Sequence, residues 1–207
     1  THPLRTHDAD RGSGAATGMT PLHKRLGAAM FSVPQNRIEA GPLATKIVVM
    51  KGGVTPQMAP PAEIYNRPAN LFVADFMGSP AMNLIPAKAR ANGNGTDIQI
   101  AQDRGDPIVL TDTKNRDLPE DVILGVRPED IGDAAMRSGA HVQEAECLID
   151  IVEPAGADTY AVMQLGGKHV TARLHSETNA APGNAQRLAF DLGKVSYFAP
   201  DTGLRLN

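Results

Sequence analysis

Residues 82–102, MNLIPAKARANGNGTDIQIAQ, hold two short runs of alternating apolar and polar residues separated by Asn-Gly-Asn-Gly. Alternation of this kind is typical of a strand with one buried face, and Asn-Gly favours the tight turn of an antiparallel hairpin. Similar runs follow at 106–111, 121–131, 145–154, 158–165, 169–174, 186–192 and 194–198. Short strands at this spacing predict a small all-β barrel or sandwich that begins near residues 78–83.

The residues before this region have a different pattern. Apolar runs at 28–33 and 45–50 predict buried strands, and residues 61–78 contain two short helical stretches, one before Pro68 and one before Gly78. The sequence therefore predicts an α+β chain in two parts, an α/β part at 1–78 and an all-β part at 79–207. We expect the apolar side chains of 28–50 to pack on the helices at 61–78, on the β part or on a second chain.

Composition narrows the function classes. The 207 residues are 42% hydrophobic and 21% charged with a net charge of −3, which is typical of a globular protein and disfavours nucleic acid as a partner. Cys147 is the only cysteine, so no internal disulfide can form, and its neighbours indicate a strand interior. No apolar run reaches about 18 residues, so we expect no membrane-spanning segment. We expect the chain to be cytoplasmic.

The candidate chemical motifs are weak. GSGAATGMT at 12–20 resembles a phosphate-binding loop but has Met19 in place of the lysine, so we interpret it as a linker. The six histidines lack metal-ligand spacing, and no metal site is expected. Arg127, Glu129 and Asp130 in GVRPEDI follow an apolar strand. They are expected to fix the strand end by an ion pair, with ligand binding as the alternative.

A family resemblance adds to this interpretation. It rests on PAEIYNRPANLFVADFMGSPAMNLIPA (61–87), LGVRPEDI (124–131), EPAGADTYAVMQLGGKHVTARL (153–174) and APGNAQRLAFDLGKVSYFAPDTGLRL (181–206). These segments resemble the C-terminal part of the ATPase subunits of ABC importers for sugars and glycerol phosphate. The resemblance runs from Leu22 to Leu206. It implies a remnant of an α/β P-loop ATPase domain, followed by a regulatory OB-like β-barrel of the TOBE type.

The resemblance also implies where catalytic groups would lie. The Walker B aspartate and the catalytic glutamate correspond to Thr1 and His2, a D-loop aspartate to Asp8, and the switch histidine to Gln35. Carboxylates organise the magnesium shell and the attacking water in phosphoryl transfer, and Thr1 and His2 are not carboxylates. Gln35 can donate a hydrogen bond but cannot become cationic. We therefore expect a truncated subunit that has no intact catalytic residue, binds no cofactor and does not hydrolyse ATP alone, although the full-length family uses ATP and Mg²⁺.

The resemblance implies a homodimer through the regulatory domain, membrane subunits of an ABC importer as partners, and a place at the inner face of the cell membrane. Three alternatives remain open at this point. The chain could complete an ATP site with another subunit, bind a small oxyanion as a stand-alone barrel, or be a dimerisation module without a ligand.

Overall fold

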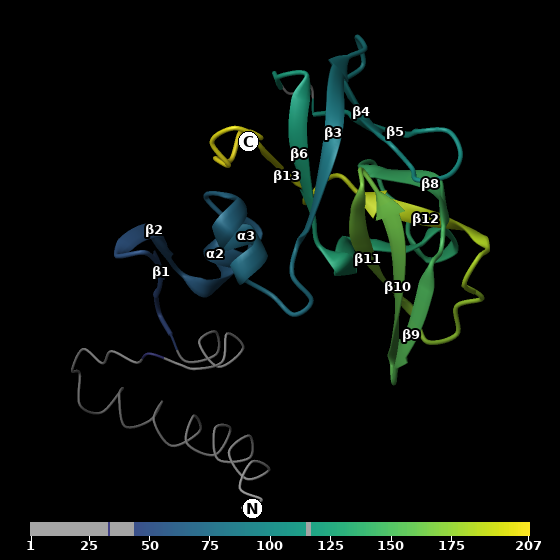
Figure 1. Ribbon diagram of the computed structural model, residues 1–207, viewed down its shortest axis with the longest axis horizontal. Coiled ribbons are helices and arrows are strands. Elements are labelled where there is room, and N and C mark those ends of the chain that lie inside the picture. Colours follow the sequence, from purple (N-terminus) through teal and green to yellow (C-terminus); the bar gives the residue numbers. More distant parts are fainter. Residues whose placement is uncertain (1–32, 34–43, 115–116) are drawn as a thin grey trace, which may run out of the picture.

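The computed structural model describes residues 33, 44–114 and 117–207 (Figure 1). Residues 47–77 form a small unit of two strands and two helices, which we call the hairpin–helix unit, and residues 83–198 form a β domain. The expected strand at 28–33 and the positions Thr1, His2, Asp8 and Gln35 lie outside the described residues. Neither of the described α-helices, each six residues long, reaches the length of a membrane-crossing helix.

The hairpin–helix unit begins with an antiparallel pair, β1 (Ile47–Lys51) and β2 (Val54–Ala59). Gly52 and Gly53 turn the hairpin with φ of 56° and 80°, which glycine adopts without a steric penalty. Helices α2 (Pro61–Asn66) and α3 (Leu71–Phe76) follow. The predicted strand at 45–50 and the two predicted helical stretches are confirmed.

This unit has an apolar cluster of its own. Val49 and Ala59 of the hairpin pack with Ile64, Val73 and Met77 of the helices, and Ile47 and Phe72 border them. The expectation that residues of 28–50 pack on the helices at 61–78 is therefore confirmed for Ile47 and Val49. Alternate side chains of a strand point to opposite faces, so Val48 is directed outward and is 47% exposed.

The β domain contains eleven named strands and two 3₁₀ turns. The strands are β3 (Asn83–Ala91), β4 (Thr96–Ile100), β5 (Ile108–Asp112), β6 (Asp121–Val126), β7 (Ile131–Asp133), β8 (Val142–Leu148), β9 (Ile151–Ala155), β10 (Asp158–Leu165), β11 (Lys168–His175), β12 (Ala185–Asp191) and β13 (Ser196–Phe198). The turns are η1 (Pro128–Asp130) and η2 (Ala134–Met136). Two predicted runs are divided: 121–131 ends as a strand at Val126, because Pro128 has no N–H for a ladder, and 145–154 breaks at Ile149 and Asp150.

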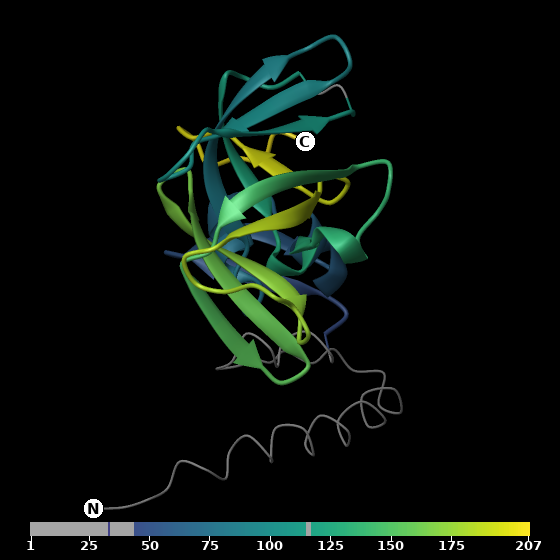
Figure 2. The ribbon, with the colours of Figure 1, turned by 90° about the vertical axis from the view of Figure 1, so that its right-hand side faces the viewer.

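These strands form three sheets with the orders β13-β6-β3-β4-β5, β7-β12-β8 and β11-β10-β9 (Figure 2). One apolar cluster lies between them, and its largest fully buried side chains include Tyr197, Phe190, Ile85, Leu124 and Met163. A bridge between Gln102 and Leu165 joins the first sheet to the third. The predicted β part is thus confirmed. Within the described residues every strand pair is antiparallel, so the parallel sheet of an α/β ATPase domain is not seen there.

Candidate functional site at the junction of the two units

Arg127 joins the β domain to both helices of the hairpin–helix unit. It follows β6, and its side chain is almost fully buried. Nη2 donates to the carbonyl oxygen of Tyr65 at 2.6 Å, and Nη1 donates to the carbonyl oxygen of Met77. Tyr65 lies in the last turn of α2, and Met77 is the C-cap of α3. One guanidinium therefore satisfies carbonyls at two helix C-termini, where orphan acceptors and the helix dipole favour a cation.

Tyr65 holds the guanidinium from a second direction. The Cζ atom of Arg127 lies 3.8 Å from the centroid of the Tyr65 ring, which is a cation–π contact. The Tyr65 hydroxyl donates to Oε1 of Glu129 in η1. Burial, followed by this hydrogen bond, raises the pKa of Tyr65 to about 12. The hydroxyl is therefore a proton donor at neutral pH, and the contacts run in a closed loop from β6 through α2 to η1.

Among the described residues, no carboxylate forms an ion pair with the buried guanidinium of Arg127. Burial lowers the pKa of Arg127, and Tyr65, Glu129 and Asp130 oppose that shift. Within the described structure its Nε atom is buried without a hydrogen-bond partner. A buried charge is expensive unless neighbouring groups stabilise it. Here the two carbonyl oxygens and the aromatic face do so, which makes Arg127 sensitive to the placement of both helices.

Gly78 makes the close approach of Arg127 possible. A Cβ atom at this position would lie 2.8 Å from Nη1 of Arg127 and 3.0 Å from the carbonyl oxygen of Pro80. The residue also has φ of +115°, which side-chain-bearing residues rarely adopt. The end of α3 therefore needs a glycine on both steric and conformational grounds.

The structure gives the three predicted residues of GVRPEDI three different sets of partners. Glu129 accepts from Tyr65 through its side chain and from Arg137 through its carbonyl oxygen. Asp130 pairs with Nζ of Lys194 at 3.2 Å. Burial raises the pKa of Asp130, and Lys194 opposes the shift. The 3₁₀ turn Pro128–Asp130 thus points the side chains apart. Arg127 and Glu129 contact Tyr65 of the hairpin–helix unit, whereas Asp130 pairs with Lys194 within the β domain.

Sequence reasoning did not identify Tyr65, Met77 or Gly78 as members of this site. Tyr65 and Arg127 are 62 residues apart, and Met77 and Arg127 are 50 apart, so no local pattern relates them. An aromatic residue in the last turn of a helix just before Pro68 was the one available signal.

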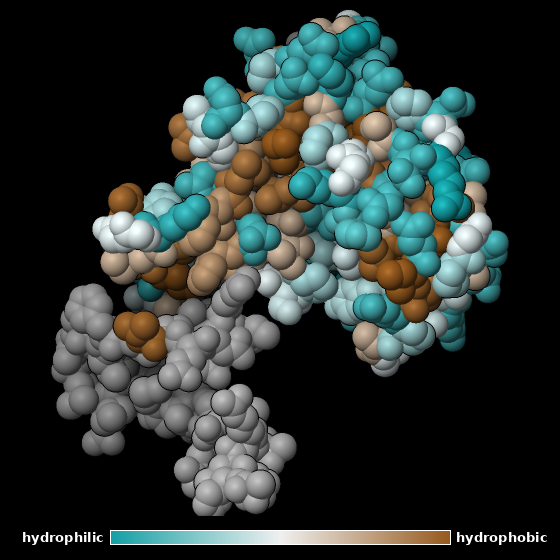
Figure 3. Space-filling view, in the orientation of Figure 1, coloured by the Kyte–Doolittle hydropathy of each residue, from teal (hydrophilic) through white to brown (hydrophobic). Residues whose placement is uncertain are grey.

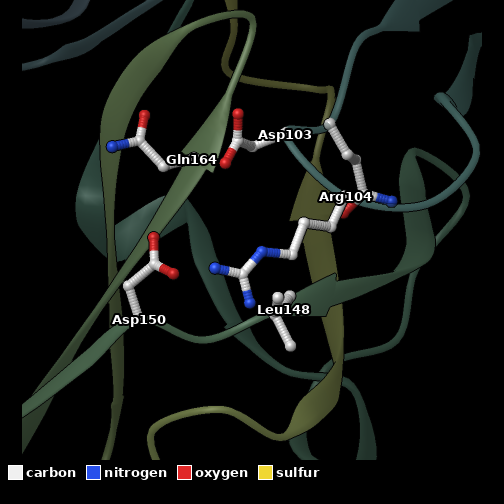
Figure 4. Close-up of a pocket in the computed structure, with 6 residues that line it drawn as sticks. Asp103, Arg104, Leu148, Asp150 and Gln164 are labelled. Carbon is white, nitrogen blue, oxygen red and sulfur yellow. The ribbon is translucent and has the colours of Figure 1, made fainter.

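A second feature is a shallow polar cleft between the β4–β5 loop, the β8–β9 turn and β10 (Figure 4). Its lining side chains are Gln102, Asp103, Arg104, Leu148, Asp150 and Gln164. Arg104 reaches between Leu148 and Asp150, and Asp103 lies across from them (Figure 4). The space has room for about one water molecule, too little for a metabolite.

Other reactive groups are inert or dispersed. Cys147 is fully buried, and burial raises the pKa of its thiol to about 12. In the part of the chain that the structure describes, no three His, Cys, Asp or Glu residues converge on a possible metal position. The contacts of Arg127 with Tyr65 and Met77 therefore remain the main polar connection between the two units in the described residues.

Comparison with known proteins places part of the β domain in a known domain family. Residues 78–131 match the family described as MalK OB fold domain, a range that begins at Gly78 and includes Arg127, Glu129 and Asp130. The relatives that match almost the whole chain are ATP-binding proteins of transport systems. The sn-glycerol-3-phosphate import ATP-binding protein UgpC of Cupriavidus necator is 36% identical, over 99% of this chain and 56% of its own length.

Two further relatives agree. The sulfoquinovosyl glycerol transport ATP-binding protein SmoE of Agrobacterium fabrum is 36% identical over 97% of this chain and 54% of its own length. The trehalose import ATP-binding protein SugC of Mycobacterium tuberculosis is 33% identical over 99% and 58%. The chain is thus homologous to the ATP-binding subunits of sugar and glycerol-phosphate ABC importers, as the sequence resemblance indicated, and it spans about half the length of these relatives.

A solved structure of the molybdate-binding protein ModG, with molybdate bound, covers 57% of this chain with a TM-score of 0.39 and 14% sequence identity. That likeness is too distant to define a fold or a ligand.

Proposed function

We propose that this chain is the regulatory portion of the ATP-binding subunit of an ABC importer for a carbohydrate or a glycerol phosphate. In this proposal the hairpin–helix unit is the end of the ATP-binding domain and the β domain, from about residue 79, is the regulatory domain. The observation that supports it most is Arg127, which directly follows β6 and whose guanidinium donates to carbonyl oxygens at the ends of α2 and α3. A displacement of the β domain would therefore move both helices.

The outer face of the hairpin supports the same proposal. Val48, Met50, Val54 and Met58 are between 47% and 66% exposed. Val48 and Met58 lie directly opposite each other, so these side chains share one face of the two-stranded sheet. Clustered exposed apolar side chains commonly mark a surface that another part covers. The remainder of an ATP-binding domain is the cover that the proposed function requires.

The proposal includes no ATP hydrolysis by this chain alone. Thr1 and His2 stand where the resemblance places two carboxylates, and Gln35 stands where it places a histidine. Without the carboxylates the magnesium shell and the attacking water lack their organising groups. We also propose a homodimer through the β domain, contact with the membrane subunits of the importer, and a place at the cytoplasmic face of the membrane.

The polar cleft of the β domain gives no support to the alternative function, oxyanion binding. The polar cleft of the β domain places the two carboxylates Asp103 and Asp150 around Arg104. Like charges repel an anion, and the space is too small to enclose one with its hydrogen-bond donors. The dimerisation module without a ligand is compatible with the proposed homodimer and differs from the proposal only in lacking importer partners.

The proposal is tested by two assays on the purified chain. The first measures phosphate release with Mg²⁺ and ATP, and we expect none above the buffer blank. The second measures capture of the detergent-solubilised importer subunits of the same cell by the immobilised chain. Capture should be weaker for Arg127→Ala and unchanged for Arg187→Ala, whose side chain is 74% exposed. Steady phosphate release that Gln35→Ala abolishes, or failure to capture any importer subunit, would contradict the proposal.

A further inference from the structure

The segment Ala199–Leu206, which we call the strap, continues the five-stranded sheet beyond β13. Phe198 and Arg205 form an antiparallel bridge. The amide of Leu206 donates to the carbonyl oxygen of Tyr197 at 2.8 Å, and the amide of Ala199 donates to that of Leu204 at 2.9 Å. The strap therefore folds back on β13 as a short edge strand.

The other edge of the strap pairs with the hairpin–helix unit. The amide of Leu71 donates to the carbonyl oxygen of Gly203 at 2.9 Å, and the amide of Arg205 donates to that of Ala69 at 3.0 Å. Asn70 and Leu204 form the antiparallel bridge between these bonds. Asn70 also caps α3, because its side chain accepts from the amide of Val73. The strap thus holds the linker between the two helices, and Figure 1 shows the C-terminal segment beside α3.

Among the described residues, the hairpin–helix unit meets the β domain through the contacts of Arg127 and Tyr65, through a small apolar cluster and through the strap, and these connections differ in burial. Arg127 is 3% exposed, and the small apolar cluster of Ala74, Met82 and Phe198 is at most 4% exposed. Figure 3 shows apolar side chains gathered where these two parts meet. The strap is more exposed, since Leu204 is 54% exposed. Two backbone hydrogen bonds join the strap to the linker, and the side chain of Leu71, which makes one of them, also packs against the apolar cluster. Exposed backbone bonds with little apolar cover are the first to open.

We propose that the strap–linker pairing is a latch that opens while the other two connections stay closed. In the open state the bonds of Leu71 to Gly203 and of Arg205 to Ala69 are broken together. The hairpin–helix unit then pivots on Arg127 and on the apolar cluster, and the strap remains paired with β13. The junction thereby has two states that differ in the orientation of one unit and require no unfolding of either. The latch is independent of the function proposed above.

Hydrogen exchange on the unmodified chain tests the latch, because four amides report on its two edges. After correction for intrinsic rates, Leu71 and Arg205 should exchange through one common opening. That opening should be at least about tenfold more frequent than the opening that exposes Leu206 and Ala199. If Leu206 exchanges as fast as Arg205, the strap frays as a whole and the latch is refuted. Equal protection of all four amides refutes it as well.

A disulfide gives a second measurement. The hydrogen-bond pattern makes Asn70 and Leu204 a non-hydrogen-bonded antiparallel pair, in which the Cβ atoms are roughly 5 Å apart and close to disulfide distance. In the double variant Asn70→Cys, Leu204→Cys, oxidation should slow exchange at Leu71 and Arg205 at least about tenfold relative to the reduced form. The reduced variant is the matched control for the lost helix cap. Unchanged exchange on oxidation would contradict the latch. If the double variant does not fold, the hydrogen-exchange measurement on the unmodified chain tests the latch by itself.

Discussion

The guanidinium of Arg127 lies 3.8 Å above the ring of Tyr65 and, at 2.6 Å, donates to the carbonyl oxygen of that same residue. Tyr65 is thus held through its ring, its backbone and its hydroxyl, which donates to Glu129. These contacts connect α2 in the hairpin–helix unit with β6 and η1 in the β domain. Single substitutions at this junction should therefore change the free energy of unfolding by amounts that report on individual contacts.

Arg127→Ala should lower the free energy of unfolding by about 2–4 kcal/mol, because two buried helix-end carbonyls lose their donor and Tyr65 loses its cation. Urea unfolding followed by circular dichroism measures this. The matched control is Arg187→Ala, which removes a surface ion pair with Glu144 and should change stability by less than about 1 kcal/mol. Similar effects of the two substitutions would show that Arg127 contributes no more than a surface charge.

Gly78→Ala should destabilise the chain by about 2–4 kcal/mol, because the new Cβ meets Nη1 of Arg127 and the backbone remains at positive φ. Gly167→Ala is the control, since it has φ of +69° and nothing within 4 Å of its added Cβ. Gly167→Ala should lower the free energy of unfolding only by the cost of placing alanine at positive φ, about 1 kcal/mol. Thermal unfolding of both variants separates the steric part from the conformational part, and equal losses would remove the steric argument.

The titration of Asp130 should make stability fall as pH rises. Burial holds the pKa of this carboxyl above its usual range, so the folded state favours the neutral form. The penalty is absent below the unfolded pKa of about 4 and develops as pH rises through the folded value. Unfolding free energies of the unmodified chain and of Asp130→Asn, measured from pH 3 to 7, should therefore diverge in favour of Asn as pH rises. A difference independent of pH would contradict this assignment.

Cys147 should not react with iodoacetamide in the folded chain. Its side chain is fully buried, and burial raises the pKa of its thiol to about 12, so both access and the thiolate form are lacking. Mass spectrometry should show modification only in denaturant. Rapid labelling in native buffer at pH 8 would show that β8 opens readily and that Cys147 could interfere with the disulfide between positions 70 and 204.

The strands were predictable wherever alternation and turn residues coincide, as in β3, β4 and β10, because these signals lie within a few residues of one another. The helices were predictable from Pro68 and Gly78, which bound them in sequence. The strap was not, since it pairs through backbone atoms on both edges and has no alternating pattern. The partners of Arg127 were not predictable either, because bonds to the carbonyl oxygens of Tyr65 and Met77 are independent of the side chains at those positions.

We expect Arg127 to make the hairpin–helix unit and the β domain one cooperative structure. Native-state hydrogen exchange tests it through the amides of Ile64 and Met77 in the helices and the ladder between β10 and β11. We predict that Arg127→Ala lowers the opening free energy of the helix amides by about 2 kcal/mol more than that of the ladder amides. An equal change at both groups of amides, or no change at the helices, would contradict the claim.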